Sequence, residues 1–331
     1  MQTPAAPRIS CLLPVYNGEE FLAEAVRSIL SQTYRDFELV IVDDGSSDSS
    51  PQILAALAAE DGRIRVVRRE NGGIVAALNT GLAVCRGEYV ARMDADDIAL
   101  PDRFQFQLDY LDAHLGCVLV GGVARSLKSD GSIGGRTTGG RHLRTDLSAF
   151  PPKIAVSMHP LITVRREALQ AIGGYRAAFP HAEDYDLFIR LSKLGGIDNP
   201  DKELLIYRRH EGAISLKHLE AQERSAALAE VDAIIADKAP APEFPNWLLE
   251  PYIRLRIWRR YLGVDRTKAA RLLPQLLGDA TTLRPETLVC PRYWGLRTRI
   301  AGSLVASVVR DAKRRRRSHS PVLATPDAAR S

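Results

Sequence analysis

The sequence has few cysteines, few aromatic side chains and no long hydrophobic run, and each shortage excludes a class of protein. The four cysteines lie far apart and form no Cys-x-x-Cys pair, at Cys11, Cys85, Cys117 and Cys290. A zinc site or a disulfide framework is therefore not expected, and the thiols are predicted to be reduced. The remaining composition, 45% hydrophobic and 26% charged over 331 residues, is typical of a globular protein.

No segment has the length and apolarity of a membrane-spanning helix. Near the C-terminus the longest uncharged apolar stretch, Ile300 to Val309, has about half of the roughly 20 residues that a spanning helix needs. The first residues, MQTPAAPR, contain no apolar core of a secretory signal. We therefore predict a cytoplasmic protein that does not cross a membrane.

Charge is distributed unevenly along the chain. Residues 1–250 carry 27 Lys and Arg against 35 Asp and Glu, a balance of −8. Residues 251–331 carry 18 against 5, a balance of +13. An acidic body followed by a basic region indicates two separate tasks, and the basic region is expected to meet an anionic partner.

The first part of the chain alternates short apolar runs with segments of helical periodicity. Strands are predicted over Ile9–Val15, Phe37–Val42, Ile64–Val67 and Tyr89–Met93, and helices over 21–30, 51–59, 74–84 and 101–115. This order predicts an α/β fold with a doubly wound, mainly parallel, Rossmann-like sheet. Further along, the Gly-rich segment Val118–Gly140 indicates strands and a hairpin, Glu183–Leu194 a helix and Glu203–Tyr207 a strand.

Acidic segments follow two of the predicted strands. Asp43–Asp48 (DDGSSD) follows the second strand, Asp94–Asp97 (DADD) follows the fourth, and the first strand ends in Pro14–Gly18 (PVYNG). Ligands of open parallel sheets bind outside the carboxyl ends of the strands, so these segments are expected at one rim. Carboxylates gathered there repel one another unless a cation is present, and oxygen ligands without His or Cys favour Mg²⁺ or Mn²⁺. Turn formation and helix capping are the alternative for either segment alone.

The expected ligand of such a rim is a nucleotide with a diphosphate. The sequence contains no G-x-G-x-x-G after the first strand and no G-x-x-x-x-G-K-[ST] at any position. These are the glycine-rich motifs with which dinucleotide-binding dehydrogenases and P-loop proteins hold phosphate. Both classes are therefore disfavoured.

Short motifs follow one another in a defined order over about residues 8–215. They are SCLLPVYN (10–17), FELVIVDDGSSD (37–48), NGG (71–73), RGEY (86–89), MDADDI (93–98), PDR (101–103), GGYR (173–176), AEDYD (182–186) and YRRH (207–210), with Ser215 after them. Each motif is weak alone, but their order and spacing together are specific. The set resembles family 2 glycosyltransferases with the GT-A fold.

The resemblance implies roles for individual residues. The nucleotide sugar would be bound by Pro14, Tyr16, Asn17, Asp44, Asn71, Asp94, Arg208 and Arg209. Asp44 would accept a hydrogen bond from the base. Asp96 would be the direct metal ligand, with Asp94 facing the ribose or the metal and His210, in a segment that closes over the diphosphate, as a further ligand. Asp184 would be the catalytic base.

The resemblance also implies an activity, that of a metal-dependent, inverting hexosyltransferase using Mn²⁺ or Mg²⁺. The donor would be a nucleoside-diphosphate sugar, a UDP-sugar being favoured, and the acceptor a saccharide or lipid-linked saccharide in surface polysaccharide or glycolipid synthesis. Sugar transfer needs stabilisation of the leaving group and a carboxylate to accept the proton of the acceptor. One alternative, a nucleotidyltransferase, would carry a basic Gly-rich loop that Pro14–Gly18 lacks. A non-catalytic sugar-nucleotide-binding module is disfavoured because all the acidic motif residues are present.

Several of these residues have a structural alternative. Glu183 and Asp184 also suit the first turn of any helix, where acids interact favourably with the helix dipole. His210 is equally consistent with a packed or surface histidine. His159 resembles a family feature near the acceptor cleft, but a structural loop fits as well. Trp247, Trp258 and Trp294 indicate packing or interfacial positions.

The domain organisation follows from these observations. Residues 1–215 are predicted to form the GT-A domain, with a nucleotide-sugar half over about 8–115 and an acceptor half over about 116–215. Residues 216–317 are predicted to be helical and basic, with arginines such as Arg254 and Arg256 interleaved with apolar side chains, and residues 318–331 to be disordered. An Arg-rich helix with Trp and Tyr favours peripheral binding to an anionic membrane at its cytoplasmic face. A solvated helical face is the alternative, and no nucleic-acid partner is expected because no recognised module is present.

Overall fold

A computed structural model describes residues 6–139, 144–147, 153–209 and 218–236, with single positions between 253 and 272. The chain divides into two compact units, Met1–Glu243 and Phe244–Ser331. In the second unit the described positions are helical, and Ile253, Tyr261 and Ala269 are buried. The rest of the predicted basic region, the three tryptophans and the C-terminal tail lie outside the described residues. The domain limits at 215 and 317 therefore stay predictions.

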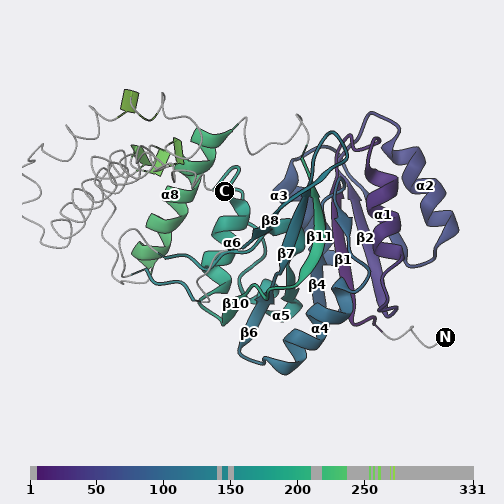
Figure 1. The fold of residues 1–331 in the computed structure, drawn as a ribbon, viewed down its shortest axis with the longest axis horizontal. Helices are drawn as coiled ribbons and strands as arrows, with labels where there is room; N and C mark the ends of the chain where they lie inside the picture. The colour runs from purple at the N-terminus through teal and green to yellow at the C-terminus, as the bar shows by residue number, and fades with distance from the viewer. Residues whose placement is uncertain are drawn as a thin grey trace, which may run out of the picture. The chain divides into compact units, whose positions relative to one another are not determined.

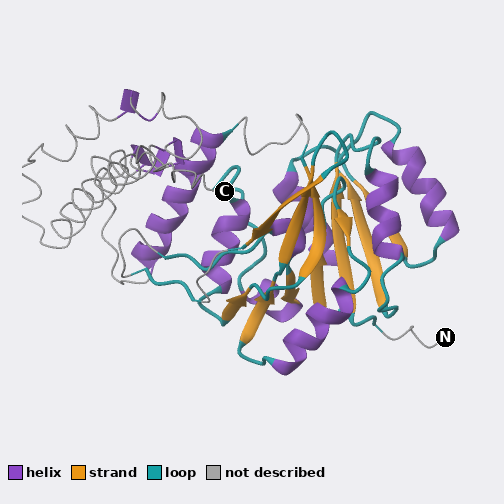
Figure 2. Ribbon diagram, in the orientation of Figure 1, coloured by secondary structure: helices purple, strands orange, loops and turns teal. Residues whose placement is uncertain are grey.

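The first unit is built on a seven-stranded sheet in the order β10-β6-β9-β4-β1-β2-β3 (Figures 1 and 2). Its strands are β1 (Ile9–Val15), β2 (Phe37–Asp43), β3 (Ile64–Arg68), β4 (Tyr89–Arg92), β6 (Cys117–Val120), β9 (Thr163–Arg165) and β10 (Gly196–Asp198). Strands β1 to β4 run parallel, and only β9 among these seven is antiparallel to its neighbours, β4 and β6. The predicted mainly parallel α/β sheet is confirmed.

Helices cover both faces of this sheet. Helices α1 (Leu22–Leu30), α2 (Ser50–Glu60) and α4 (Arg103–Ala113) contribute to one core cluster, together with Cys11 and Leu13 of β1. Helices α3 (Ile74–Val84), α5 (Arg166–Ala171) and α6 (Glu183–Leu191) contribute to a second cluster, together with Leu12 of β1. Because successive side chains of a strand point to opposite faces, the near-continuous apolar run of β1 supplies both cores.

A smaller, four-stranded sheet lies in the order β5-β11-β7-β8. It comprises β5 (Ile98–Ala99), β11 (Glu203–Arg208), β7 (Val123–Leu127) and β8 (Ile133–Thr138), the last two forming the predicted hairpin. Strand β5 follows directly on the acidic segment after β4, and β11 pairs antiparallel with it. The chain therefore returns to that acidic segment at Arg208, more than a hundred residues later.

Two further helices lie in the described part of the first unit. The 3-10 helix η1 (His159–Leu161) precedes β9, and α8 (Leu219–Ala236) packs along α6. The helix predicted over Glu183–Leu194 ends at Leu191, since Gly195 and Gly196 lead the backbone straight into β10. None of the helices in the described ranges is long and apolar enough to cross a membrane.

Candidate active site

The carboxyl ends of β1, β2 and β4 meet at one rim, as the sequence predicts. Parallel pairing sets Val15 of β1 opposite Asp43 of β2, and the Asp44 amide donates to the Val15 carbonyl at 2.9 Å. On the other side of β1, the Met93 amide donates to the Leu12 carbonyl at 3.0 Å, so the acidic segment Asp94–Asp97 begins immediately beyond. The three loops expected to bind a nucleotide are thus neighbours.

Part of the loop after β2 forms the turns and caps that were the alternative prediction. The Asp43 carboxylate accepts from the Ser46 amide at 2.9 Å, and Asp48 accepts from the amides of Glu19 and Ser50, both at 3.0 Å. Asn17, with a φ of 50°, accepts from the Ser47 amide through its side chain at 2.8 Å. These groups hold the loops after β1 and β2 together.

Asp44 is 3% exposed and already has three protein donors. Its carboxylate pairs with Arg69 and accepts from the amides of Gly73 at 2.8 Å and of Gly72 at 3.2 Å. These glycines precede α3, so Asp44 ties the loop after β2 to the start of that helix. A carboxylate has about four acceptor positions, which leaves one for the predicted bond to a base. Arg69, which the sequence analysis did not select, is the charged neighbour of this position.

The loop that carries Asn71 lies tightly against the loop after β2. Gly45 has a φ of 78°, and a Cβ at this position would lie 2.7 Å from the backbone nitrogen of Asn71. Glycine is required at Gly45 because both the backbone conformation and the close approach exclude a side chain. Asn71 is exposed at this contact.

The two predicted residues at the end of β1 differ in exposure. Tyr16 is 54% exposed, whereas Pro14 is buried within the strand.

Asp94, Asp96 and Asp97 each contribute a carboxylate oxygen to a cluster in which these atoms lie within 4.8 Å of one another. Asp97 is fully buried, and its Oδ2 has no hydrogen-bond partner in the described part of the chain. Burial, with the charges of Asp94 and Asp96, raises the pKa of Asp97 well above its ordinary value. Burial and the neighbouring Asp96 likewise raise the pKa of Asp94.

This donor set fits a hard divalent cation. Three carboxylates, with no sulfur or imidazole ligand among the described residues, suit Mg²⁺ or Mn²⁺. A buried carboxylate oxygen without a partner is normally costly. A cation at the cluster would relieve the repulsion that raises these pKa values and would satisfy the Asp97 oxygen. Asp97 was quoted within the motif but not selected as a ligand, and the structure adds it to the candidate set.

Arg92 is the buried counter-charge of Asp94 in the acidic cluster. It lies at the end of β4, is 5% exposed, and pairs through Nη2 with Asp94 Oδ1 at 2.5 Å. Its Nε and Nη1 have no partner among the described residues. The buried Arg103 of the PDR motif donates to the Arg92 carbonyl at 2.6 Å and so supports the end of this strand. Arg92 ends β4 and Asp94 lies two residues beyond it, a spacing that in extended backbone puts both side chains on one side and could have identified the pair from sequence.

Arg208 reaches the acidic cluster from β11. Its amide donates to Asp97 Oδ1 and its Nε to the Asp96 carbonyl, both at 2.9 Å, while its Nη2 pairs with Glu24 of α1. Arg208 therefore braces the loop that holds the cluster. Arg209 is exposed next to it, and His210 lies outside the described residues, so its predicted metal contact stays a prediction.

Asp184 occupies the first turn of α6 and accepts from the Tyr185 amide at 2.7 Å. Burial, followed by the charge of Glu183, raises the pKa of Asp184 to about 6. Burial also raises the pKa of Glu183, whose Oε2 has no partner in the residues described. Arg92 lowers the pKa of both carboxyls, which shows that they lie in reach of the guanidinium that also pairs with Asp94.

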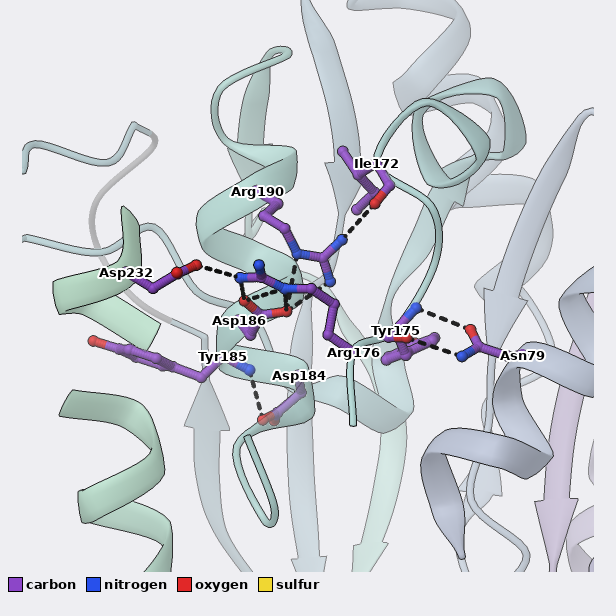
Figure 3. Close-up of polar contacts among 9 residues, drawn as sticks. All are labelled: Asn79, Ile172, Tyr175, Arg176, Asp184, Tyr185, Asp186, Arg190 and Asp232. Atoms are coloured by element: carbon purple, nitrogen blue, oxygen red, sulfur yellow. Dashed lines mark hydrogen bonds and ion pairs between the residues drawn. The ribbon is translucent and has the colours of Figure 1, made fainter. Parts of the chain in front are cut away.

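The chain leading to α6 is tightly fixed (Figure 3). The Asn79 side chain of α3 donates to the Tyr175 carbonyl and accepts from the Tyr175 amide, both at 2.9 Å. The Tyr175 hydroxyl bonds to His159 Nε2 at 2.8 Å, and burial lowers the pKa of His159 well below its ordinary value. The hydrogen bond and the burial fix His159 in the packed segment before β9, as the structural-loop alternative predicts. Arg176 and Arg190 converge on the Asp186 carboxylate.

Comparisons with known proteins identify relatives of this chain. The family model described as Glycosyl transferase family 2 matches residues 10–173. An uncharacterized glycosyltransferase of Haemophilus influenzae is 30% identical over 232 residues, covering 66% of this chain and 71% of the relative. Chondroitin synthase of Escherichia coli is 30% identical over 222 residues, covering 66% of this chain and 31% of that protein. The chain spans about a third of the length of several curated relatives that it matches.

Solved structures share the fold. S. aureus TarS 1-349 in complex with UDP-GlcNAc superposes with a TM-score of 0.56 at 19% identity, covering 85% of this chain and 77% of that one. The mannosyltransferase PcManGT from Pyrobaculum calidifontis, in complex with GDP-Man and Mn²⁺, superposes with a TM-score of 0.54 at 19% identity, covering 93% and 88%. The chain has a GT-A-type fold and belongs to glycosyltransferase family 2.

Proposed function

We propose that the protein is an inverting glycosyltransferase that moves a sugar from a nucleoside-diphosphate sugar to an acceptor hydroxyl. The observation that carries this proposal is that Arg92 pairs with the acidic cluster at Asp94 and also lowers the pKa of the separate carboxyl of Asp184. The Asp94-Asp96-Asp97 cluster suits a divalent cation with a diphosphate. The separate Asp184 carboxyl, with a pKa of about 6, suits a general base.

Asp96 is proposed as the direct ligand of Mn²⁺ or Mg²⁺, with Asp94 and Asp97 beside it and His210 as a further ligand. A bound cation supplies neutralisation of the negative charge that develops on the leaving diphosphate. The chemistry of the donor set and the unpartnered Asp97 oxygen support this assignment. The similar mannosyltransferase described with Mn²⁺ supports it independently.

The nucleotide is proposed to bind along the loops after β1, β2 and β3. Pro14, Tyr16, Asn17 and Asn71 are proposed to line this edge, and Asp44 with Arg69 to hold the base. Arg208 and Arg209 are proposed to contact the diphosphate. A UDP-sugar is the favoured donor, and the similar TarS structure with UDP-GlcNAc supports that choice.

The transfer step needs only one base. The acceptor hydroxyl gives its proton to Asp184 while its oxygen bonds to the anomeric carbon, and the bond from that carbon to the diphosphate oxygen breaks. With Asp184 on the face of the sugar opposite the diphosphate, attack would be in line with the bond that breaks and would invert the anomeric configuration. Two nitrogens of Arg92 and one oxygen of Glu183, which have no hydrogen-bond partner among the described residues, are proposed to bind sugar hydroxyls.

The acceptor is proposed to be a saccharide or lipid-linked saccharide in surface polysaccharide or glycolipid synthesis. The similarity to chondroitin synthase supports a polysaccharide context. The +13 balance of residues 251–331 supports peripheral binding to an anionic membrane surface at its cytoplasmic face. Family membership favours glycosyl transfer over the nucleotidyl transfer considered from the sequence.

The test is release of nucleoside diphosphate from a panel of sugar nucleotides with Mn²⁺, Mg²⁺ or EDTA, alongside thermal shifts of the same mixtures. A donor should stabilise the fold and lose its diphosphate only when the metal is present. Binding without release would identify a non-catalytic module. Release of pyrophosphate from a nucleoside triphosphate would identify a nucleotidyltransferase.

A further inference from the structure

Helix α8 lies beyond the segment that the family model matches, which ends at residue 173. It nevertheless packs along α6, the helix that begins with Glu183 and Asp184. The contact includes an apolar cluster of Phe179 and Ile189 with Ala229 and Ala233. An apolar contact of this kind requires no buried charge.

Glu230 places a buried acidic side chain in this otherwise apolar contact. It is 1% exposed in the middle of α8, and its Oε1 accepts a hydrogen bond from the Tyr185 hydroxyl at 2.5 Å. A buried carboxylate is costly unless it is hydrogen-bonded, so this bond gives the glutamate a defined partner. Tyr185 is the residue directly after Asp184.

Tyr185 links Glu230 to the base through one residue. Its ring packs with the apolar cluster and its hydroxyl is held by Glu230, while its backbone amide donates to Asp184 Oδ1 at 2.7 Å. Figure 3 shows Tyr185 directed toward α8 and its amide directed toward Asp184. The same residue thus contacts Glu230 with its side chain and Asp184 with its backbone amide.

We propose that Glu230 is a positioning residue for sugar transfer, which holds Asp184 in its reactive orientation through Tyr185. The inference rests on the proposed function, because it takes Asp184 as the base. It extends the catalytic apparatus from α6 to α8, and both helices lie beyond the residues that the family model matches. Displacing a reacting group by about 1 Å can lower a rate about 100-fold.

The experiment compares full-length variants. Glu230→Ala and Tyr185→Phe each break the side-chain bond, and Glu230→Gln keeps an oxygen that can accept from the tyrosine. Asp232→Asn is the matched control, because Asp232 lies on the same helix, is half exposed and pairs with Arg176. Arg176 also pairs with Asp186, so it keeps one partner when Asp232 is replaced. Thermal unfolding of each variant shows whether α8 remains folded.

We expect Glu230→Ala and Tyr185→Phe each to lower kcat at least about tenfold with little change in donor KM. The effects of the two substitutions should be less than additive in the double variant, because the two residues share the Glu230–Tyr185 hydrogen bond. Glu230→Gln should recover most of the rate, and Asp232→Asn should match the wild type. Wild-type kcat in both Glu230→Ala and Tyr185→Phe would overturn the inference.

The pKa of Asp184 gives a second measurement that general destabilisation would not move. The groups acting on Asp184 are Glu183 in the same turn, Arg92 of β4 and the Tyr185 amide, and the amide bond lowers its pKa. In Glu230→Ala the Tyr185 amide should bond less well to Asp184, which raises the pKa of that carboxyl. The acid limb of the kcat profile should therefore shift to higher pH.

The same pKa is accessible without turnover. The stability difference between a protein and its Asp184→Asn variant, followed against pH, reports the titration of Asp184. Its midpoint should be higher in the Glu230→Ala background than in the wild type, and an unchanged midpoint would count against the inference. If the wild type transfers no sugar, the proposed function is overturned. The pH dependence of stability would still test the link between Glu230 and Asp184, so the two failures can be told apart.

Discussion

Arg92 pairs with Asp94 through one of its three guanidinium nitrogens and leaves the other two buried without a partner in the described structure. The same guanidinium lowers the pKa of Glu183 and of Asp184. Arg92 is thus a shared counter-charge for the two halves of the proposed active site. A buried arginine with free donors is costly to retain for stability alone.

Replacing Arg92 should therefore change the titration of the base. We expect Arg92→Gln to raise the pKa of Asp184, because the favourable charge that opposes burial is lost. The acid limb of kcat should move to higher pH. Arg86→Gln is a suitable control, since Arg86 pairs with Glu38 at the opposite ends of the strands. An unchanged acid limb in Arg92→Gln would contradict the shared role.

Asp96→Ala should abolish metal-dependent donor binding while leaving the fold intact. The carboxylate is part of the cluster that fits a cation, and its removal relieves repulsion rather than creating a cavity. In the wild type, nucleoside diphosphate with Mn²⁺ at about 100 times its Kd should add about 2.7 kcal/mol to the unfolding free energy. Calorimetric titration of Asp96→Ala should show no such binding. Asp102→Ala, which removes an exposed partner of Lys202, serves as the control and should bind normally.

Asp184→Asn should lower turnover by about 10²–10⁴-fold with little change in donor affinity. A general base acts in the transition state, and its loss typically has an effect of this size. The measurement is kcat for transfer, with donor Kd determined separately. A collapse in donor affinity with persistent turnover of bound donor would show that Asp184 is a binding residue instead.

The pH dependence of activity and of stability should have opposite directions around pH 6. The base works when ionised, so kcat should rise through a pKa of about 6, and this limb should disappear in Asp184→Asn. In the folded state Asp184 keeps its proton up to a pKa of about 6, whereas in the unfolded chain it loses the proton near its ordinary pKa of 3.8. Ionised Asp184 therefore destabilises the folded state above pH 6, and this destabilisation is absent below about pH 4.

Asp184→Asn should therefore be more stable than the wild type at pH 8, by about 2 kcal/mol after allowance for partial exposure, and equal to it near pH 4. Denaturant unfolding at both pH values, with EDTA present, measures the difference. A less stable Asp184→Asn at pH 8 would show that the ionised carboxylate contributes to folding.

Truncation after Pro240 should separate donor chemistry from membrane binding. The proposed catalytic and nucleotide-binding residues, and α8, all precede this point, whereas the basic residues 251–331 follow it. Donor hydrolysis should be largely retained, while binding to anionic liposomes, which salt should weaken, should be lost. Cosedimentation with vesicles of varied anionic lipid content compares the two proteins. Full-length protein that stays in the supernatant at low salt would refute the tether.

Much of the fold followed from local pattern. The apolar runs of β1 and β2 are continuous because helices cover both faces of the sheet, and Ile9–Val15 and Ile74–Val84 have the bounds expected from sequence. Boundaries set by turns were predicted less accurately: the helix predicted to end at Leu194 ends at Leu191. The backbone conformation of Gly195 and Gly196 depends on β10, which follows, and the local pattern does not contain that information.

The sequence by itself determined the doubly wound α/β sheet and the motif residues, because periodicity and strand order already bring Asp44 and Asp94 to one rim. Only the tertiary structure decided which charges meet across elements. Arg69 closes on Asp44 from the loop after β3, Arg208 returns to Asp97 from β11, and Glu230 reaches Tyr185 from α8. These contacts join residues that no local pattern relates, since burial and packing, rather than spacing along the chain, set which charged groups must share a partner.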